Sequence, residues 1–179
     1  CESAQACGMT GQDVFVRHWL HAAMVRYQGE KMSKSLGNLI WARDLLKSHS
    51  ADAVRIVVTS HPYHESWEYD HGELLPADRL AALLLDAAQA EGGPGSALDP
   101  AEDEASFAAA LADDLNTRAA YASLSRWGER MLAAASSGQS LAMAQDALRR
   151  MGRVMGLCLG QPIEERVAAG WDRHYRRFL

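Results

Sequence analysis

Apolar residues recur at three- and four-residue intervals through the second half of the chain. One such stripe follows Pro76 and consists of Leu80, Leu83, Leu84 and Ala87. This spacing places the side chains on one face of an α-helix. Proline suits the first helical turn, where its missing N–H removes no hydrogen bond. The segment is therefore expected to form a helix whose apolar face packs against other elements.

Further helices are expected after the glycine-rich loop at residues 92–96. Asp99-Pro100-Ala101-Glu102 has the form of a helix start, with an acidic cap and an early proline. The three stripes that follow are Phe107, Leu111 and Leu115; then Ala120, Leu124, Trp127 and Met131; and then Leu141, Ala144, Leu148, Met151 and Met155. A last helix is expected from Pro162 towards Phe178. Short loops make successive helices antiparallel neighbours, so residues 76–179 are predicted to form an antiparallel helical bundle.

Residues 1–75 carry a different pattern, typical of a fragment of an α/β fold. Residues 2–8 are expected to be the end of a helix closed by Gly8, and residues 10–13 have the capping-box form. Residues 18–25 are expected to be extended, with a turn at residues 27–29.

Two short helices are expected next. The first covers residues 41–47, and the second covers residues 51–60 with Ser50 as its cap. The candidates for burial in the second helix are Val54, Ile56, Val57 and Val58. The fold class expected for the whole chain is mainly α.

The stretch Glu30-Lys-Met-Ser-Lys-Ser-Leu-Gly-Asn38 carries the strongest chemical signal. Lys31 and Lys34 lie three residues apart among hydroxyl and glycine residues. Two ammonium groups on a mobile loop can follow the negative charge that grows on departing phosphates and stabilise it in the transition state. Hydroxyl and backbone donors beside them can approach phosphate oxygens closely. For the lysines alone, a solvated surface loop is the alternative interpretation.

Residues 31–35 match the Lys-Met-Ser-Lys-Ser signature of class I aminoacyl-tRNA synthetases letter for letter. The longer run, from His18 to Leu46, resembles cysteinyl-tRNA synthetases and the related cysteine ligases of mycothiol synthesis. The resemblance implies a remnant of the class I α/β catalytic domain before the bundle. It also implies catalytic roles for Lys34 and, as an auxiliary phosphate contact, Lys31. ATP and Mg²⁺ are the implied cofactors, and the implied ATP-binding residues are Lys31, Met32, Ser33, Lys34 and Ser35.

The same resemblance places Glu2 at a metal position. In cysteinyl-tRNA synthetases the matching glutamate helps to hold zinc, together with a histidine and cysteines further upstream. Zinc requires four ligands, and the others would precede residue 1, so Zn²⁺ is expected in the parent protein only. His18 and His21 would point to opposite faces of a strand and are not expected to share a metal.

Charge is distributed unevenly along the chain. Residues 61–117 carry a net charge of −12, whereas residues 1–60 carry +2 and residues 118–179 carry +5. This pattern excludes a uniformly basic nucleic-acid binder, although the basic ends could meet phosphates. An odd number of cysteines without paired spacing favours a reducing cytoplasm. No apolar run approaches the roughly 20 residues that cross a bilayer, and the start at Cys1 resembles neither a signal nor a transit peptide.

The function implied by the resemblance is that of the C-terminal part of a cysteine–tRNA ligase. Residues 1–75 would be the end of the catalytic domain, and residues 76–179 would bind tRNA. Because the nucleotide-binding half with its His-Ile-Gly-His motif is missing, the isolated chain is expected to be inactive. One alternative is a cysteine ligase with an amino-sugar acceptor.

The second alternative is a non-catalytic helical module that binds RNA. Its phosphate contacts would come from arginines of the bundle, unless these only form helix-surface pairs. The arginines are Arg118, Arg126, Arg130, Arg149, Arg150 and Arg153.

Two further stretches can be compared with the family pattern, and only the second departs from it. Residues 113–117, Asp-Asp-Leu-Asn-Thr, are similar to a turn in the helical domain of cysteinyl-tRNA synthetases and are expected to be structural. Residues 61–64, His-Pro-Tyr-His, lie where that family often has a basic element. The second stretch therefore favours a divergent protein with an altered substrate.

Overall fold

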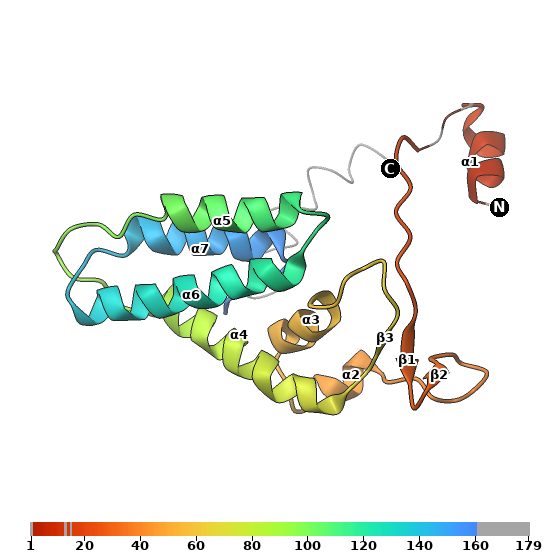
Figure 1. Cartoon of the computed structure of the whole chain (residues 1–179), viewed down its shortest axis with the longest axis horizontal. Coiled ribbons are helices and arrows are strands. Elements are labelled where there is room, and N and C mark those ends of the chain that lie inside the picture. The colour runs from red at the N-terminus through yellow and green to blue at the C-terminus, as the bar shows by residue number, and fades with distance from the viewer. Residues whose placement is uncertain (1, 13, 15, 161–179) are drawn as a thin grey trace.

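The computed structural model describes residues 2–12, 14 and 16–160 (Figure 1). Helices dominate this part of the chain, so the expected fold class, mainly α, is confirmed. The helices are α1 (Glu2–Thr10), α2 (Ala42–Leu45), α3 (Ala51–Thr59), α4 (Leu74–Gln89), α5 (Ala101–Ala112), α6 (Thr117–Ser136) and α7 (Ala142–Val154). The strands β1 (Val25–Tyr27), β2 (Glu30–Lys31) and β3 (Trp67–Glu68) form one small sheet, and the 3₁₀-helix η1 (His71–Glu73) leads into α4.

Helices α4 to α7 lie side by side and run alternately in opposite directions, which confirms the antiparallel bundle (Figure 1). Every residue of the stripes predicted for α6 and α7 is buried, and Trp127 is the largest of the fully buried side chains. The helix predicted from Pro162 lies outside the described residues. The bundle therefore forms as the apolar periodicity predicts, because each stripe is removed from water only by packing against its neighbours.

Two predicted core positions are wrong. Leu115 is 45% exposed, because α5 ends at Ala112 and Leu115 occupies a left-handed turn with φ of 55°. Val58 is 54% exposed on the outer face of α3, whereas its neighbours Ile56 and Val57 are buried. In both cases the local apolar pattern extends beyond the face that the tertiary structure covers.

The first helix differs from its prediction. Helix α1 continues through Gly8 to Thr10, and the chain turns at Gly11, whose φ is 67° and whose N–H donates to Cys7 O at 2.8 Å. The Thr10 hydroxyl donates back to Ala6 O at 2.8 Å and accepts from the Gln12 N–H at 3.4 Å. Thr10 is the last residue of α1, so its predicted place at the start of a helix is wrong, whereas Asp13 of the predicted capping box lies outside the described residues. Gly11 supplies the left-handed residue that ends helices of this kind.

The short helices α2 and α3 form where they are predicted. Ser50 caps α3 by accepting a hydrogen bond from the Ala53 N–H at 3.0 Å. Strand β3, in contrast, lies in a polar stretch that gave no strand signal. It pairs with β1 in parallel, with Arg26 opposite Glu68, and so places residues 42 positions apart in sequence beside each other.

One hydrophobic cluster runs from α3 through α4 into the bundle. The Asp52 carboxylate in the first turn of α3 accepts hydrogen bonds from the N–H groups of Cys158 and Leu159, at 2.6 and 2.9 Å. The end of the bundle is thereby fixed to α3. The division of the chain at residues 75 and 76 stays a prediction. Within the described ranges, no helix combines the length and apolar character that a membrane span needs.

A buried tyrosine between α3 and α6 predicts how stability depends on pH. The Tyr121 hydroxyl lies 2.6 Å from Thr59 Oγ1, and burial raises the pKa of the Tyr121 phenol. The folded state therefore keeps a proton that the unfolded state releases above about pH 10. The free energy of unfolding should fall as pH rises through this range. Urea unfolding at about pH 8 and about pH 10.5 measures the fall.

The matched variant for this prediction is Tyr121→Phe, which should show a shallower decline between the two pH values. Part of the decline should remain, because burial also raises the pKa of Tyr69. An identical decline in the variant and the unmodified chain would contradict the assignment to Tyr121.

Candidate functional site

Strands β1 and β2 form the hairpin that carries the signature loop. They pair antiparallel, with Arg26 opposite Lys31 and Tyr27 opposite Glu30. The turn between them has two residues, Gln28 and Gly29, with φ of 57° and 78°. Positive φ at both positions matches the twist of paired strands and makes this the tightest common hairpin connection. The turn predicted at residues 27–29 is therefore confirmed.

The hairpin turn is also held from outside. The Gly29 N–H donates to Glu68 Oε1 of β3 at 2.9 Å, and the Arg26 guanidinium donates to Gly29 O. The Tyr69 N–H adds a hydrogen bond to Arg26 O at 2.8 Å. No local sequence pattern predicts these contacts, because Glu68 follows Gly29 by 39 residues. They fix the hairpin without using any residue of the signature loop.

The signature loop, residues 31–38, begins at the last residue of β2 and is closed by Asn38. The Asn38 side chain accepts from the Ser33 N–H at 2.9 Å and donates to Lys31 O at 3.3 Å. Inside the loop, the Ser33 and Ser35 hydroxyls lie 3.2 Å apart, and Gly37, with φ of 68°, donates its N–H to Lys34 O at 3.2 Å. The backbone of the loop is therefore ordered by its own polar groups.

Met32 connects the loop to the body of the protein. Its N–H donates to Val25 O at 3.1 Å and continues the β1–β2 ladder by one step. Its side chain is half-buried and packs against the hydrophobic core. The loop thus has one apolar attachment, while the residues that follow Met32 stay near the surface.

Both lysines of the loop are exposed, and neither forms an ion pair with any residue in the described part of the chain. Lys47 behaves differently, since its ammonium lies 2.6 Å from Asp44 Oδ1 and lowers the pKa of that carboxyl. The ammonium groups of Lys31 and Lys34 are consequently available to an anionic ligand. A lysine stem is flexible, so both groups can reach outwards from an ordered backbone.

The described residues do not supply a zinc site. Glu2 is exposed on α1, and no group of three or more His, Cys, Asp or Glu side chains in the described ranges is placed to hold a metal ion. A single carboxylate does not satisfy the tetrahedral coordination of zinc. The role of Glu2 as one ligand stays a prediction, and no chemical step is assigned to it.

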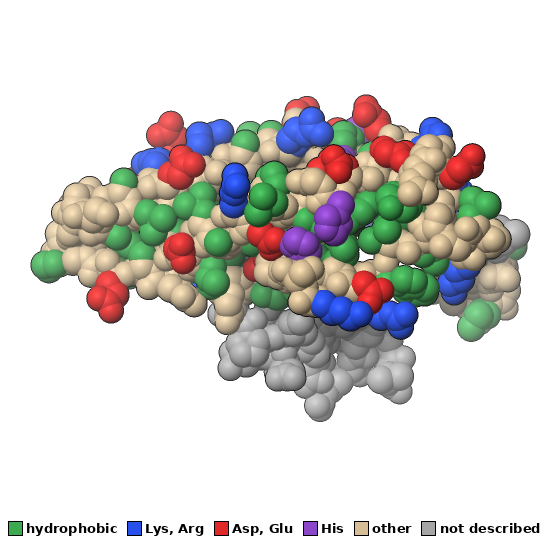
Figure 2. Space-filling model, turned by 90° about the horizontal axis from the view of Figure 1, so that it is seen from below, with side chains coloured by type: hydrophobic (Ala, Val, Ile, Leu, Met, Phe, Trp, Pro, Cys, Tyr) green, Lys and Arg blue, Asp and Glu red, His purple; other side chains and the backbone are tan. Residues whose placement is uncertain are grey.

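Among the described residues, four of the six bundle arginines have side-chain hydrogen bonds or ion pairs. Arg130 pairs with Asp103 and lies over the ring of Trp127, and Arg150 donates twice to Glu104 Oε1, at 2.7 and 3.1 Å. Arg149 and Arg126 also donate within the bundle. The Arg149 guanidinium donates to Ala88 O at 3.2 Å, and the Arg126 guanidinium donates to Ser123 Oγ at 3.0 Å. On the face in Figure 2, acidic and basic side chains are interspersed without a continuous basic patch. These contacts favour helix-stabilising pairs over a set of free phosphate contacts.

Residues 1–79 match the family described as the class I (C) catalytic domain of tRNA synthetases, and residues 106–160 match the DALR domain. An L-cysteine:1D-myo-inositol 2-amino-2-deoxy-alpha-D-glucopyranoside ligase from Thermobifida fusca is 37% identical over 73% of this chain and 31% of its own length. Cysteine–tRNA ligases from Rhodospirillum rubrum and Tolumonas auensis are 35% and 37% identical over 90% of this chain, and over 34% and 35% of their own lengths.

The chain thus spans about a third of the length of the curated relatives that it matches. The two matched domains follow each other in the same order as the signature hairpin and the helical bundle in the structure. The chain belongs to the class I tRNA synthetase family, in the group that contains the cysteine–tRNA ligases.

Proposed function

We propose that this chain is the signature-loop and helical part of a cysteine–tRNA ligase, which activates cysteine with ATP and then transfers it to tRNA. Residues 1–75 belong to the end of the catalytic domain in this proposal, and residues 76–179 to a tRNA-binding bundle. A role in protein synthesis implies a cytoplasmic location. The observation that carries the proposal is a pair of exposed ammonium groups, without an ion-pair partner among the described residues, on a loop whose backbone is closed by Asn38.

The chemistry assigned to the loop is stabilisation of the leaving group. When the cysteine carboxylate attacks the α-phosphorus of ATP, the bond to pyrophosphate breaks and negative charge grows on the departing oxygens. The ammonium group of Lys34 donates hydrogen bonds to these oxygens, and Lys31 assists from the adjoining strand. Mg²⁺ supplies further neutralisation of the phosphate charge when it is bound. Contacts that strengthen as the charge develops lower the barrier more than they tighten ATP binding.

Transfer RNA is favoured as the acceptor by the extent of the similarity. The relatives named cysteine–tRNA ligase align with 88–90% of this chain, and the relatives that ligate cysteine to the amino sugar align with 64–82%. A tRNA is large enough to contact an extended helical surface, whereas an amino sugar is not.

The test joins this chain to the upstream catalytic segment and measures cysteine-dependent exchange of pyrophosphate into ATP. Cysteine transfer is then compared between cysteine-specific tRNA and the amino sugar 1D-myo-inositol 2-amino-2-deoxy-alpha-D-glucopyranoside. Exchange followed by transfer to tRNA supports the proposal. Exchange followed by transfer to the sugar alone would show that the acceptor is the amino sugar and not tRNA. Absence of cysteine-dependent exchange would reject the ligase function.

Asn38 gives a separate prediction about the loop. Replacing Asn38 by alanine removes the hydrogen bonds to the Ser33 N–H and to Lys31 O, so the loop should lose its closed form. A displacement of about 1 Å at a reacting group costs on the order of 100-fold in rate. Pyrophosphate exchange should therefore fall about 10- to 100-fold in the joined protein.

The thermal unfolding midpoint of the Asn38→Ala variant should stay close to that of the unmodified protein, because Asn38 lies outside the hydrophobic core. Full exchange activity in this variant would show that the closed loop is not required for activation.

A further inference from the structure

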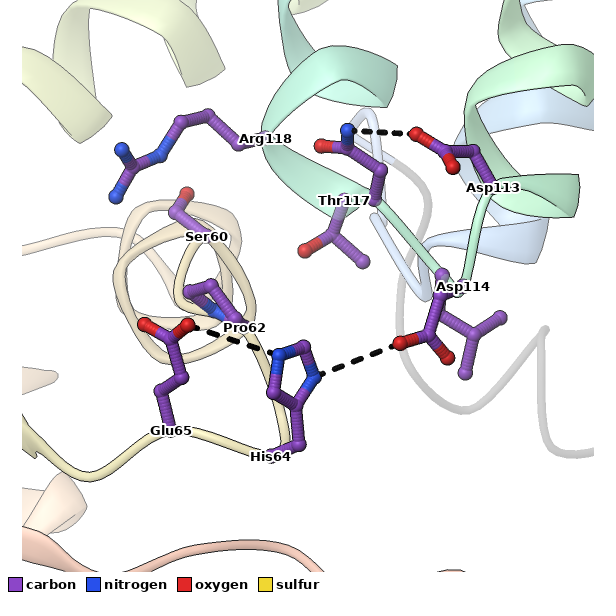
Figure 3. A pocket seen from close by; sticks show the side chains of 10 residues that line it. Ser60, Pro62, His64, Glu65, Asp113, Asp114, Thr117 and Arg118 are labelled. Atoms are coloured by element: carbon purple, nitrogen blue, oxygen red, sulfur yellow. Dashed lines mark hydrogen bonds and ion pairs between the residues drawn. The ribbon is translucent and has the colours of Figure 1, made fainter.

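Two stretches that the sequence analysis sets apart, residues 61–64 and 113–117, meet in the structure (Figure 3). The Tyr63 hydroxyl donates to Asp114 Oδ1 at 2.9 Å. His64 lies beside this pair, with Nδ1 3.6 Å from Asp114 Oδ2 and Nε2 3.6 Å from Glu65 Oε1. Together these segments line a cleft of about 360 Å³ between the end of α3 and the start of α6. The Tyr63–Asp114 hydrogen bond thus connects the bundle with the part of the chain that contains the hairpin.

The bundle presents the Asp114 carboxylate from a rigid turn. Asp114 and Leu115 both occupy the left-handed region, with φ of 47° and 55°. Main-chain hydrogen bonds from Leu115 N to Leu111 O and from Asn116 N to Ala110 O, both 3.1 Å, hold this conformation. The Asn116 side chain caps α6 by accepting from the Ala119 N–H at 3.1 Å. The position of the carboxylate is therefore set by α5 and α6 together.

Tyr63 reaches the signature hairpin through its main chain. Its carbonyl oxygen accepts a hydrogen bond from the Ala23 N–H at 2.7 Å, two residues before β1 begins. At the start of β1, Val25 O accepts from the Met32 N–H of the signature loop. One residue therefore contacts the bundle with its side chain and the segment that leads into β1 with its backbone. The hydrogen bond to Asp114 also raises the pKa of the Tyr63 phenol, as expected for a hydroxyl that donates to a carboxylate.

We propose that Tyr63 is a positioning residue that sets the helical bundle relative to the signature hairpin, with Asp114 as its partner in the bundle. This role rests on the proposed ligase function. Cysteine activation uses the hairpin, which Glu68 and Arg26 fix independently of the bundle. Transfer requires in addition that an acceptor held by the bundle reaches the activated cysteine. Loss of the Tyr63–Asp114 contact should therefore impair transfer and spare activation.

The decisive variant is Tyr63→Phe in the protein that carries the upstream catalytic segment. It keeps the ring and the main-chain contact to Ala23, and it removes only the hydroxyl. Pyrophosphate exchange should stay within about twofold of the unmodified protein, while kcat/KM for charging of cysteine-specific tRNA should fall about threefold to tenfold, as expected for one exposed hydrogen bond.

The matched control is Asp114→Asn. Asparagine tolerates the left-handed backbone and retains an oxygen that accepts from Tyr63, so charging should stay within about twofold. Alanine at this position would add backbone strain and is unsuitable. Unchanged charging in Tyr63→Phe, equal losses of exchange and charging in it, or equal charging losses in Tyr63→Phe and Asp114→Asn would each overturn the positioning role. Absence of exchange in the unmodified protein would instead reject the ligase function and this role with it.

Discussion

Replacement of Lys34 by alanine is expected to lower cysteine-dependent pyrophosphate exchange about 100- to 1,000-fold, the usual cost of removing one donor that stabilises transition-state charge. Lys34 is exposed and forms no ion pair with the described residues, so its removal should leave the fold intact. The loss should appear mainly in kcat, because the contact strengthens as the pyrophosphate departs. Lys31→Ala should cause a smaller loss, since Lys31 is assigned an auxiliary contact.

Lys47→Ala is the matched control for this experiment. Lys47 lies in the turn that follows α2, and its side chain is 74% exposed and bonded to Asp44. Its removal takes away the same charge without touching the loop, so exchange should remain within about twofold; surface pairs of this kind contribute little to stability. Undiminished exchange in Lys34→Ala, or equal losses in Lys34→Ala and Lys47→Ala, would refute the role assigned to Lys34.

Replacement of Gly93 by alanine is expected to lower the free energy of unfolding by about 1–3 kcal/mol or more, as for other overpacked positions. A Cβ atom at Gly93 would overlap main-chain atoms of Gly138, including its Cα at 2.7 Å. No side-chain rotation can relieve a clash with backbone. The loop would have to move and would strain the hydrogen bonds from Gly93 N to Gln139 O and from Gly95 N to Gly138 O, at 2.8 and 2.9 Å.

Gly8→Ala serves as the control for Gly93→Ala. Gly8 lies inside α1, and a Cβ atom there would meet no other atom within 4 Å. Alanine favours the helical backbone over glycine by about 1 kcal/mol, so Gly8→Ala should leave the stability unchanged or slightly raised. Chemical denaturation of both variants measures the difference. A Gly93→Ala variant as stable as the unmodified chain would show that the loop at residues 92–96 is a loose connection.

The comparison of these two glycines shows where sequence reasoning succeeds and where it stops. The sequence identifies residues 92–96 as a loop, and the structure confirms it. The loop nevertheless packs tightly against the turn at Gly138, and glycine is required there because two backbones approach each other. In the same way, the sequence predicts that a glycine ends the first helix. It selects Gly8, although the left-handed residue is Gly11.

Some residues of the candidate site are recognisable from the sequence, and others only from the structure. Lys31 and Lys34 are recognisable because the signature is contiguous, and their chemistry follows from charge and flexibility. Asn38 is adjacent to the signature, yet its closing of the loop becomes evident only from its two hydrogen bonds. Glu68 and the Tyr63–Asp114 contact carry no sequence signal, since their partners lie 39 and 51 residues away.

The sequence by itself determined the helices of the bundle, the cap of α3, the hairpin turn and the signature loop. Each of these depends on interactions within a few residues, through apolar periodicity, a capping side chain or a left-handed turn. Only the tertiary structure decided that β3 pairs with β1, that Val58 and Leu115 face solvent, and that Tyr63 meets Asp114. The physical reason is that such contacts depend on the packing of whole elements, which brings together residues that no local pattern relates.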